Sequence, residues 1–290
     1  MKKIVGYILK SLLFIARILA AVLILYFAFN ISNKWNYIFD RFDTQMRWND
    51  DVGFEGRGTA ENPYLIQSTD DFILFADSVN NGGLFTSAYF LQTVDVDLED
   101  VENFEPIGSL TSGYSFRGIY NGGGHKIYNL NIDGDELENN NVALFGVLEG
   151  TVMNLGIESG NIRGECAAGI AYTAGYEGAL IINCYNNARI HGEIRCGGIA
   201  DSFYYGKIIN CANFGRLSCG DICSQICSFD CGEVIACCNL DSSRHPMLNY
   251  ESISGRVYDC YVGHGDLEEM NARHESVSSY LPEGVELVNW

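Results

Sequence analysis

A four-residue signature recurs along the second half of the chain and restricts the fold more than any other feature. Its first copy is Ile127-Tyr128-Asn129-Leu130, and the later copies follow at intervals of 25, 29, 27, 26 and 23 residues. The last positions of the six copies are Leu130, Leu155, Cys184, Cys211, Cys237 and Cys260. A second apolar signature runs beside the first, and its central residues are Leu144, Ile170, Ile199, Ile226 and Ile253. Repeats of this length are typical of solenoids, in which each repeat packs on the next.

The segments between the signatures are rich in Gly, Asn and Asp, and none is apolar at helical spacing for long enough to form a helix. A period near 27 residues instead accommodates one coil of short strands, stacked at the spacing of paired strands, about 4.8 Å. Gly supplies positive φ at the corners, and Asn or Asp side chains bond the open backbone of a turn. The sequence therefore predicts an all-β right-handed parallel β-helix, with each of the two sets of signature residues forming one inward column.

The open strands at both ends of such a stack need covers. Residues 68–79 predict a helical cap at the amino end, with Ser68 as its polar cap, acids in its first turn and Phe72, Phe75 and Val79 on one face. A short helix is expected from Leu267 to Met270. The predicted organisation is a cap with the first coils over 57–125, repeats over 126–262, and a carboxyl-terminal cap and tail over 263–290.

The amino-terminal segment resembles a membrane anchor. Residues 12–31 are apolar apart from Arg17 and Asn30, which is about the length needed to cross a hydrocarbon core. Lysines precede the run in residues 1–11 and acids soon follow it, so the positive-inside rule places residues 1–11 in the cytoplasm. The sequence predicts a single-pass membrane protein with residues 32–56 as a stalk and the body outside the cell. A cleaved signal peptide is the alternative.

The charge of the chain disfavours nucleic acid as a partner. Lys and Arg number 18 against 37 Asp and Glu, so the formal net charge is −19. Binding to a phosphate backbone depends on clustered Lys and Arg, and no basic stripe occurs beyond residue 57.

Several motifs in fixed order resemble the GLUG-motif repeat proteins, which are bacterial surface β-helices found beside adhesin and immunoglobulin A peptidase-like regions. The resemblance begins at Gly58-Thr59-Ala60-Glu61-Asn62-Pro63, passes through Phe116-Arg117-Gly118-Ile119, and continues over roughly residues 57–262. The tetrapeptide that names the family appears as Ala143-Leu144-Phe145-Gly146, and later copies end in Tyr172 and Asp201 instead of Gly. The resemblance implies a surface-displayed scaffold or adhesive module and carries no catalytic residues.

All eleven Cys fall between Cys166 and Cys260. The four that share the signature position are expected to be small buried residues stacked inside the coil, close enough for oxidation. A denser run offers a weaker alternative, a metal site made by Cys219, Cys223, Cys227 and Cys231. Gly and Ser between these residues argue against a helical stripe of ligands, so no metal and no cofactor are predicted.

Other polar groups offer candidate sites. Asp201 and Asp230, on neighbouring coils, are the best candidates for the carboxylate pair of a glycosidase. The acidic runs at 95–100 and 133–136 could hold calcium but are better read as solvated turns, and the five His share no repeat position. Tyr204 and Tyr205, in the run that Phe203 begins, could stack on sugars.

The sequence thus predicts a membrane-anchored, surface-displayed scaffold that binds an extracellular protein or carbohydrate, with no catalysis of its own. The alternatives are a carbohydrate-active β-helix enzyme, either glycosidase or lyase, and a structural component of the cell envelope.

Overall fold

The computed structural model describes residues 53–83, 85–174, 178–229, 232–239, 246, 257–262, 267–272 and 274–290. The predicted segments 1–11 and 12–31, and all but the end of the predicted stalk, lie outside these residues, as do Asp230, Cys231 and Ile253. Within the described part of the chain, no helix combines the length and apolar character that crossing a bilayer requires.

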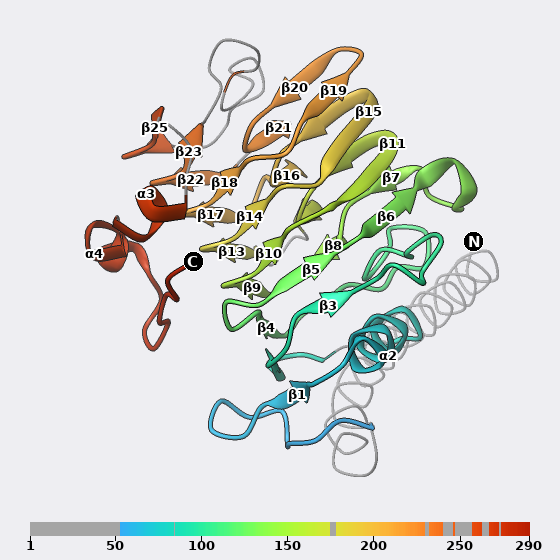
Figure 1. The fold of residues 1–290 in the computed structure, drawn as a ribbon, viewed down its shortest axis with the longest axis vertical. Helices are drawn as coiled ribbons and strands as arrows, with labels where there is room; N and C mark the ends of the chain where they lie inside the picture. The colour runs from blue at the N-terminus through green and yellow to red at the C-terminus, as the bar shows by residue number, and fades with distance from the viewer. Residues whose placement is uncertain are drawn as a thin grey trace, which may run out of the picture. The chain divides into compact units, whose positions relative to one another are not determined.

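The described residues wind into a parallel β-solenoid of right-handed type, of about six turns (Figure 1). Each turn contributes short strands to stacked parallel sheets, which confirms the predicted fold class. The first sheet contains β1 (Tyr64–Ile66), β2 (Tyr89–Gln92), β4 (Ile119–Asn121), β9 (Thr151–Met153), β13 (Leu180–Ile182), β17 (Lys207–Ile209), β22 (Glu233–Ile235) and β24 (Val257–Tyr258). The second contains β3 (Val96–Asp97), β5 (Lys126–Tyr128), β10 (Gly156–Ile157), β14 (Tyr185–Asn186), β18 (Ala212–Asn213), β23 (Cys238–Asn239) and β25 (Tyr261–Val262).

Two further sheets complete the wall of the solenoid. The third contains β6 (Leu130–Asp133), β7 (Asn141–Val142), β11 (Gly160–Ala168), β15 (Arg189–Gly197), β19 (Leu217–Cys219) and β20 (Ile222–Ser224). The fourth contains β8 (Phe145–Leu148), β12 (Ala171–Ala174), β16 (Ala200–Ser202) and β21 (Cys227–Phe229). A short 3-10 helix, η1 (Gly134–Glu136), follows β6.

The corner between the first and second sheets is a single residue with positive φ in turn after turn. It is occupied by Asn154, Asn183 and Asn210, whose φ angles lie between 50° and 52°. Asn tolerates this left-handed conformation better than most residues, which explains its place in the signature. The three side chains also form a buried ladder, because Nδ2 of Asn183 donates to Oδ1 of Asn154 at 2.8 Å and Nδ2 of Asn210 donates to Oδ1 of Asn183 at 2.9 Å.

The predicted inward columns are largely confirmed. Leu155, Cys184, Cys211 and Cys237 are fully buried, and the amides of Cys184 and Cys211 each lie 3.4 Å from the Sγ of the next member. Cys260 follows, since its Sγ lies 3.3 Å from the amide of Cys237. The second column is also buried and stacked, and its described members are Leu144, Ile170, Ile199 and Ile226.

The placement of Leu130 in the first column is wrong. Val152 pairs with Tyr120, not with a residue of the first signature copy, while Ile127 pairs with Ile157 in the second sheet. Leu130 is buried, but it lies opposite Gly160 in the third sheet. The error has a local cause. Asn129 also adopts a positive φ, 55°, so the same apolar-apolar-Asn sequence builds a different corner of the coil.

The predicted amino-terminal helix is confirmed as α2 (Thr69–Asn80). The hydroxyl of Ser68 accepts a hydrogen bond from the Asp71 amide, and the helix stops before Asn81. Its buried face inserts Phe72, Phe75 and Val79 into the first coils. The ring of Phe75 is surrounded by aromatic neighbours at centroid distances of 4.7 to 6.5 Å, which are Phe72, Phe85, Phe90, Phe116, Tyr120 and Phe145.

The carboxyl-terminal segment contains the expected helix, α3 (Leu267–Ala272), followed by α4 (His274–Val277) and the 3-10 helix η3 (Ser278–Tyr280). It lies along the flank of several coils, whereas the sequence predicted a cover for the end of the stack (Figure 1). Val277 is buried against outward-facing side chains of the first sheet, namely Met153, Ile182, Ile209 and Ile235. Val288 binds the asparagine ladder, since its amide donates to Oδ1 of Asn154 at 3.2 Å. An apolar outer face on the first sheet explains this placement, because the tail removes that face from water.

Candidate functional site

Two neighbouring hollows on the flank of the solenoid form one groove. The first, of about 360 Å³, lies beside Tyr114, Tyr204 and Tyr205, and the second, of about 500 Å³, continues past Lys207. Both are lined by Arg117, Glu149 and Tyr205, so they share a wall, and we call them together the tyrosine groove.

A buried anchor positions the two tyrosines of this groove. β16 ends at Ser202, and the next residue, Phe203, is fully buried. The chain then turns, with the Gly206 amide donating to the Phe203 carbonyl at 3.2 Å. Tyr204 and Tyr205 occupy the turn, where they are 47% and 53% exposed and their rings meet edge-on at 4.5 Å. The aromatic run that could stack on sugars is thus divided between core and surface.

An ion pair contributes charge to the wall where the two hollows meet. Nε of Arg117 lies 2.5 Å from Oε2 of Glu149, and the Ser115 hydroxyl joins both, donating to Glu149 at 2.8 Å and accepting from Arg117 at 3.1 Å. At the far end, Nζ of Lys207 lies 2.7 Å from Oε2 of Glu233. The cations near the groove are therefore neutralised by neighbouring acids, and the site presents fixed hydrogen-bonding groups beside aromatic faces.

Sequence reasoning identified Tyr204 and Tyr205 but missed Arg117, Glu149 and Tyr114. Tyr114 and Arg117 come from one coil and Glu149 from the next, and no local motif connects them to the two tyrosines. Among the described residues that line the two hollows, Glu149 supplies the single carboxylate. A glycosidase would need a second carboxylate across the cleft.

Asp201 does not face a cleft, contrary to the geometry that a catalytic pair with Asp230 requires. Its carboxylate is fully buried, and Arg195 binds both oxygens, with Nε at 3.3 Å and Nη2 at 3.0 Å. The hydroxyls of Ser202 and Ser228 donate to the same group. Burial, reinforced by the charge of Asp201, raises the pKa of Tyr172 to about 12. Every oxygen of Asp201 is therefore committed to internal bonds, which fits a structural role.

The two acidic runs serve turns and ion pairs. Oδ1 of Asp95 accepts from the Lys126 amide at 3.0 Å, and Oδ1 of Asp97 accepts from Nδ2 of Asn129 at 2.8 Å. Asp135 pairs with Nη2 of Arg163 at 2.5 Å. These contacts agree with the expectation of solvated turns.

The described His residues also occupy structural positions. Nδ1 of His125 lies 3.3 Å from Oδ1 of Asp95, and His191 is exposed on β15. Nε2 of His274 lies 3.3 Å from Oδ1 of Asn183 in the ladder. His245 and His264 fall outside the described residues.

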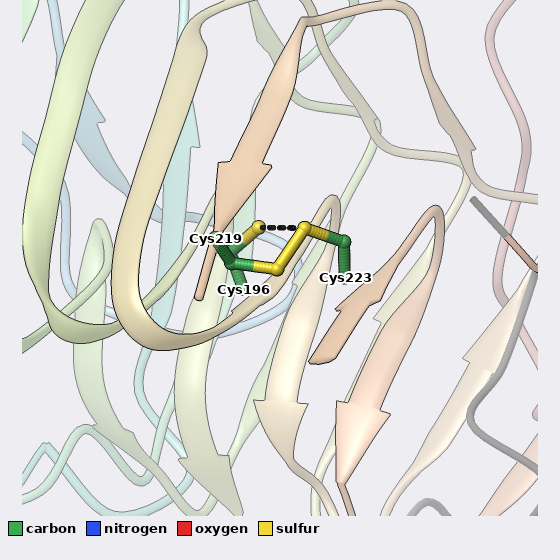
Figure 2. A group of neighbouring side chains, drawn as sticks. All are labelled: Cys196, Cys219 and Cys223. Carbon is green, nitrogen blue, oxygen red and sulfur yellow. Dashed lines mark hydrogen bonds between the residues drawn. A yellow bond between two sulfur atoms is a disulfide. The ribbon is translucent and has the colours of Figure 1, made fainter. Parts of the chain in front are cut away.

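The run of cysteines separates into different environments. Cys219 and Cys223 form a disulfide, and Figure 2 shows a third residue, Cys196, beside them. Cys227 lies on the fourth sheet, in β21, and is disulfide-bonded as well. Cys227 is therefore not part of this cluster, although the weaker alternative of a metal site included it. Cys231, the fourth member of that alternative, lies outside the described residues, and Cys196 was missed. The missed signal is the repeat interval, because Cys196 and Cys223 lie 27 residues apart. In the column, Cys184, Cys211, Cys237 and Cys260 remain thiols.

The chain resembles two known proteins over part of its length. No protein-family profile matches it. It is 31% identical over 155 residues to Halomucin of Haloquadratum walsbyi, a match that takes in 50% of this chain and only 2% of that protein. A solved structure from Bacteroides ovatus, described as a "putative immunoglobulin A1 protease", is 19% identical and superposes with a TM-score of 0.45 over 71% of this chain and 77% of that one.

Proposed function

We propose that this chain is a surface-displayed β-solenoid that binds neutral carbohydrate in the tyrosine groove. The observation that carries the proposal is the pair Tyr204 and Tyr205, which are held outward by a buried anchor and are about half exposed. A folded chain gains nothing in stability from leaving two adjacent large rings in water, so their exposure favours a ligand.

Sugar rings match the chemistry of this groove. Aromatic faces stack on the apolar C–H faces of a sugar, and the Arg117–Glu149 pair, held by Ser115, offers fixed donors and acceptors to hydroxyl groups. The chain carries a net charge of −19, so the field around the groove repels acidic polymers and favours a neutral glycan.

Display at the surface is supported by the likeness to Halomucin and by the predicted membrane anchor. The resemblance to GLUG-motif repeat proteins, which remains a prediction, supports an adhesive role in the same location. A groove with one carboxylate among its described residues favours binding over hydrolysis.

The test is a binding screen of the purified full chain against neutral and acidic polysaccharides. We expect a neutral glycan to bind the wild type, and the double variant Tyr204→Ala/Tyr205→Ala to lose at least tenfold in affinity, about 1.4 kcal/mol. Tyr128→Ala, at a half-buried tyrosine of the second sheet outside the groove, is the matched control and should bind as the wild type does.

Two results would contradict the proposal. One is equal glycan affinity in the double variant and the wild type, which would place the ligand elsewhere. The other is release of shortened oligosaccharides by the wild type during the screen, which would make the chain an enzyme.

A further inference from the structure

Three sulfur atoms from two successive coils meet at one point of the third sheet. β15 pairs along its length with both β19 and β20, and the register places Cys219 opposite Gly192 and Cys223 opposite Cys196. The three Sγ atoms all lie within 4.8 Å of one another. Figure 2 shows the side chains turned toward one another, with Cys219 and Cys223 joined.

The cluster depends on cysteines at two positions where the preceding coil has no sulfur. The coil before β15 carries Ala167 opposite Cys196 and Gly164 opposite Gly192, so it has no sulfur at these positions. A Cβ at Gly192 would lie 1.9 Å from the Arg195 carbonyl oxygen, so no side chain fits at position 192. In the next coil, Cys219 occupies the equivalent position and directs its sulfur toward Cys223.

The spacing of the sulfurs suits a metal ion once the disulfide is open. A tetrahedral zinc site with Zn–S bonds of about 2.3 Å holds its sulfurs roughly 3.8 Å apart. The Sγ atoms of Cys196 and Cys223 lie 3.6 Å apart, close to that separation. Strand pairing sets this distance, and it does not require the disulfide, because Cys196 and Cys223 are register partners on neighbouring strands.

Burial supplies the other half of the site. Cys196 is buried, whereas Cys219 and Cys223 are partly exposed, so a bound ion would have protein on one side and solvent on the other. A divalent cation supplies the positive charge that such a buried sulfur lacks.

We propose that Cys196, Cys219 and Cys223 in the reduced chain bind one thiophilic divalent cation of the Zn²⁺ class, with water as the fourth ligand. A dithiol reductant first transfers two electrons and two protons to the Cys219–Cys223 disulfide and is itself oxidised to a disulfide. Coordination then replaces three S–H protons, which are released to solvent. The oxidised chain lacks two of the three ligands, so it binds no metal here.

The test is metal titration of the purified full chain with Zn²⁺, before and after anaerobic reduction by a dithiol that is then removed. We expect reduction to add one high-affinity Zn²⁺ per chain. Cys196→Ser and Cys223→Ser should each weaken that site at least 100-fold. The matched control is Cys184→Ala. It removes a buried thiol of the first column, far from the cluster in sequence, and should keep the Zn²⁺ site.

A second readout separates coordination from folding. Co²⁺ in the reduced wild type should give the sulfur-to-metal charge-transfer bands of thiolate ligands, and these should weaken in Cys196→Ser while its far-ultraviolet circular dichroism matches the wild type. The proposal fails if reduction adds no Zn²⁺, if the oxidised chain binds equally well, or if Cys196→Ser retains the site. The proposal also fails if the three reduced cysteines only exchange disulfide partners with one another and bind no Zn²⁺.

Discussion

The two ends of the solenoid fill the same kind of coil in different ways. Around α2 the core is a cluster of large rings centred on Phe75, to which the helix and several coils contribute. From β9 onward the interior is a set of columns, in which Ile stacks on Ile, Cys on Cys and Asn on Asn.

The difference follows from what each region packs against. The first coils pack against a helix, whose side chains enter at helical spacing and require individually shaped neighbours. A later coil packs against another coil, so the side chain that suits one layer also suits the next. The columns therefore make the later coils depend on their nearest neighbours, whereas the ring cluster unites several elements at once.

The largest effect is expected from Ile199→Asp, in the second column. Ile199 is fully buried, and its amide donates to Ile226 at 3.0 Å, so a carboxylate there would be desolvated without a partner. We expect a loss of roughly 5 kcal/mol or more in unfolding free energy. Hydrogen exchange should show loss of protection in β16 and β21 while α2 remains protected. Equal loss in α2 would contradict the distinction between the two regions.

Phe75→Ala tests the other region. Removing the central ring leaves a cavity among its aromatic neighbours, and we expect a cost of about 3 to 5 kcal/mol. Chemical denaturation followed by circular dichroism measures the cost. Leu74→Ala, on the exposed face of the same helix, is the control and should cost under about 0.5 kcal/mol. A similar cost for both variants would mean that the ring cluster is not the core of this region.

Asn183→Ala should have an intermediate effect of about 1 to 3 kcal/mol, because it leaves the ladder partners Asn154 and Asn210 without their central bonds. Asn183→Gly keeps the positive φ at low strain and removes the same bonds. The difference between the two variants, measured by thermal unfolding, separates corner strain from the ladder. If Asn183→Gly is as stable as the wild type, the ladder contributes nothing.

The smallest effect concerns His274, where burial lowers the pKa below its ordinary value of 6.5. Below about pH 6.5 the unfolded chain binds a proton that the folded chain resists, so stability falls as the pH decreases toward the folded-state pKa. We expect the melting temperature to decrease between pH 7.5 and 5.5, and His274→Gln to reduce that decrease. His191→Gln, at an exposed His, should leave it unchanged. An identical decrease in His274→Gln would assign the pH dependence to other groups.

The parts of this fold that sequence predicted correctly are those in which one local rule suffices. The columns that contain Cys184 and Ile199 were predictable because equivalent residues of successive repeats can be aligned by their spacing. The helix α2 was predictable because its capping residue and its apolar periodicity indicate the same segment. Leu130 was misplaced for the same reason, since Asn129 obeys the corner rule at another corner. The position of the tail was not predicted, because the outer face of the first sheet carries no mark in sequence that says what will cover it.

The repeat interval alone specified a coiled stack of strands, because every turn must bring equivalent side chains to the same height. It could not specify which residues from different coils share a surface. Arg117, Glu149 and Tyr205 line one groove only because successive coils stack on one another, and Cys196 meets Cys219 only because β15 and β19 are paired strands. Asp201 shows the same limit, since the corner between β15 and β16 places it beside Arg195, where it is buried. Backbone pairing is repeated and therefore readable, whereas each side-chain constellation occurs once, where the coils meet.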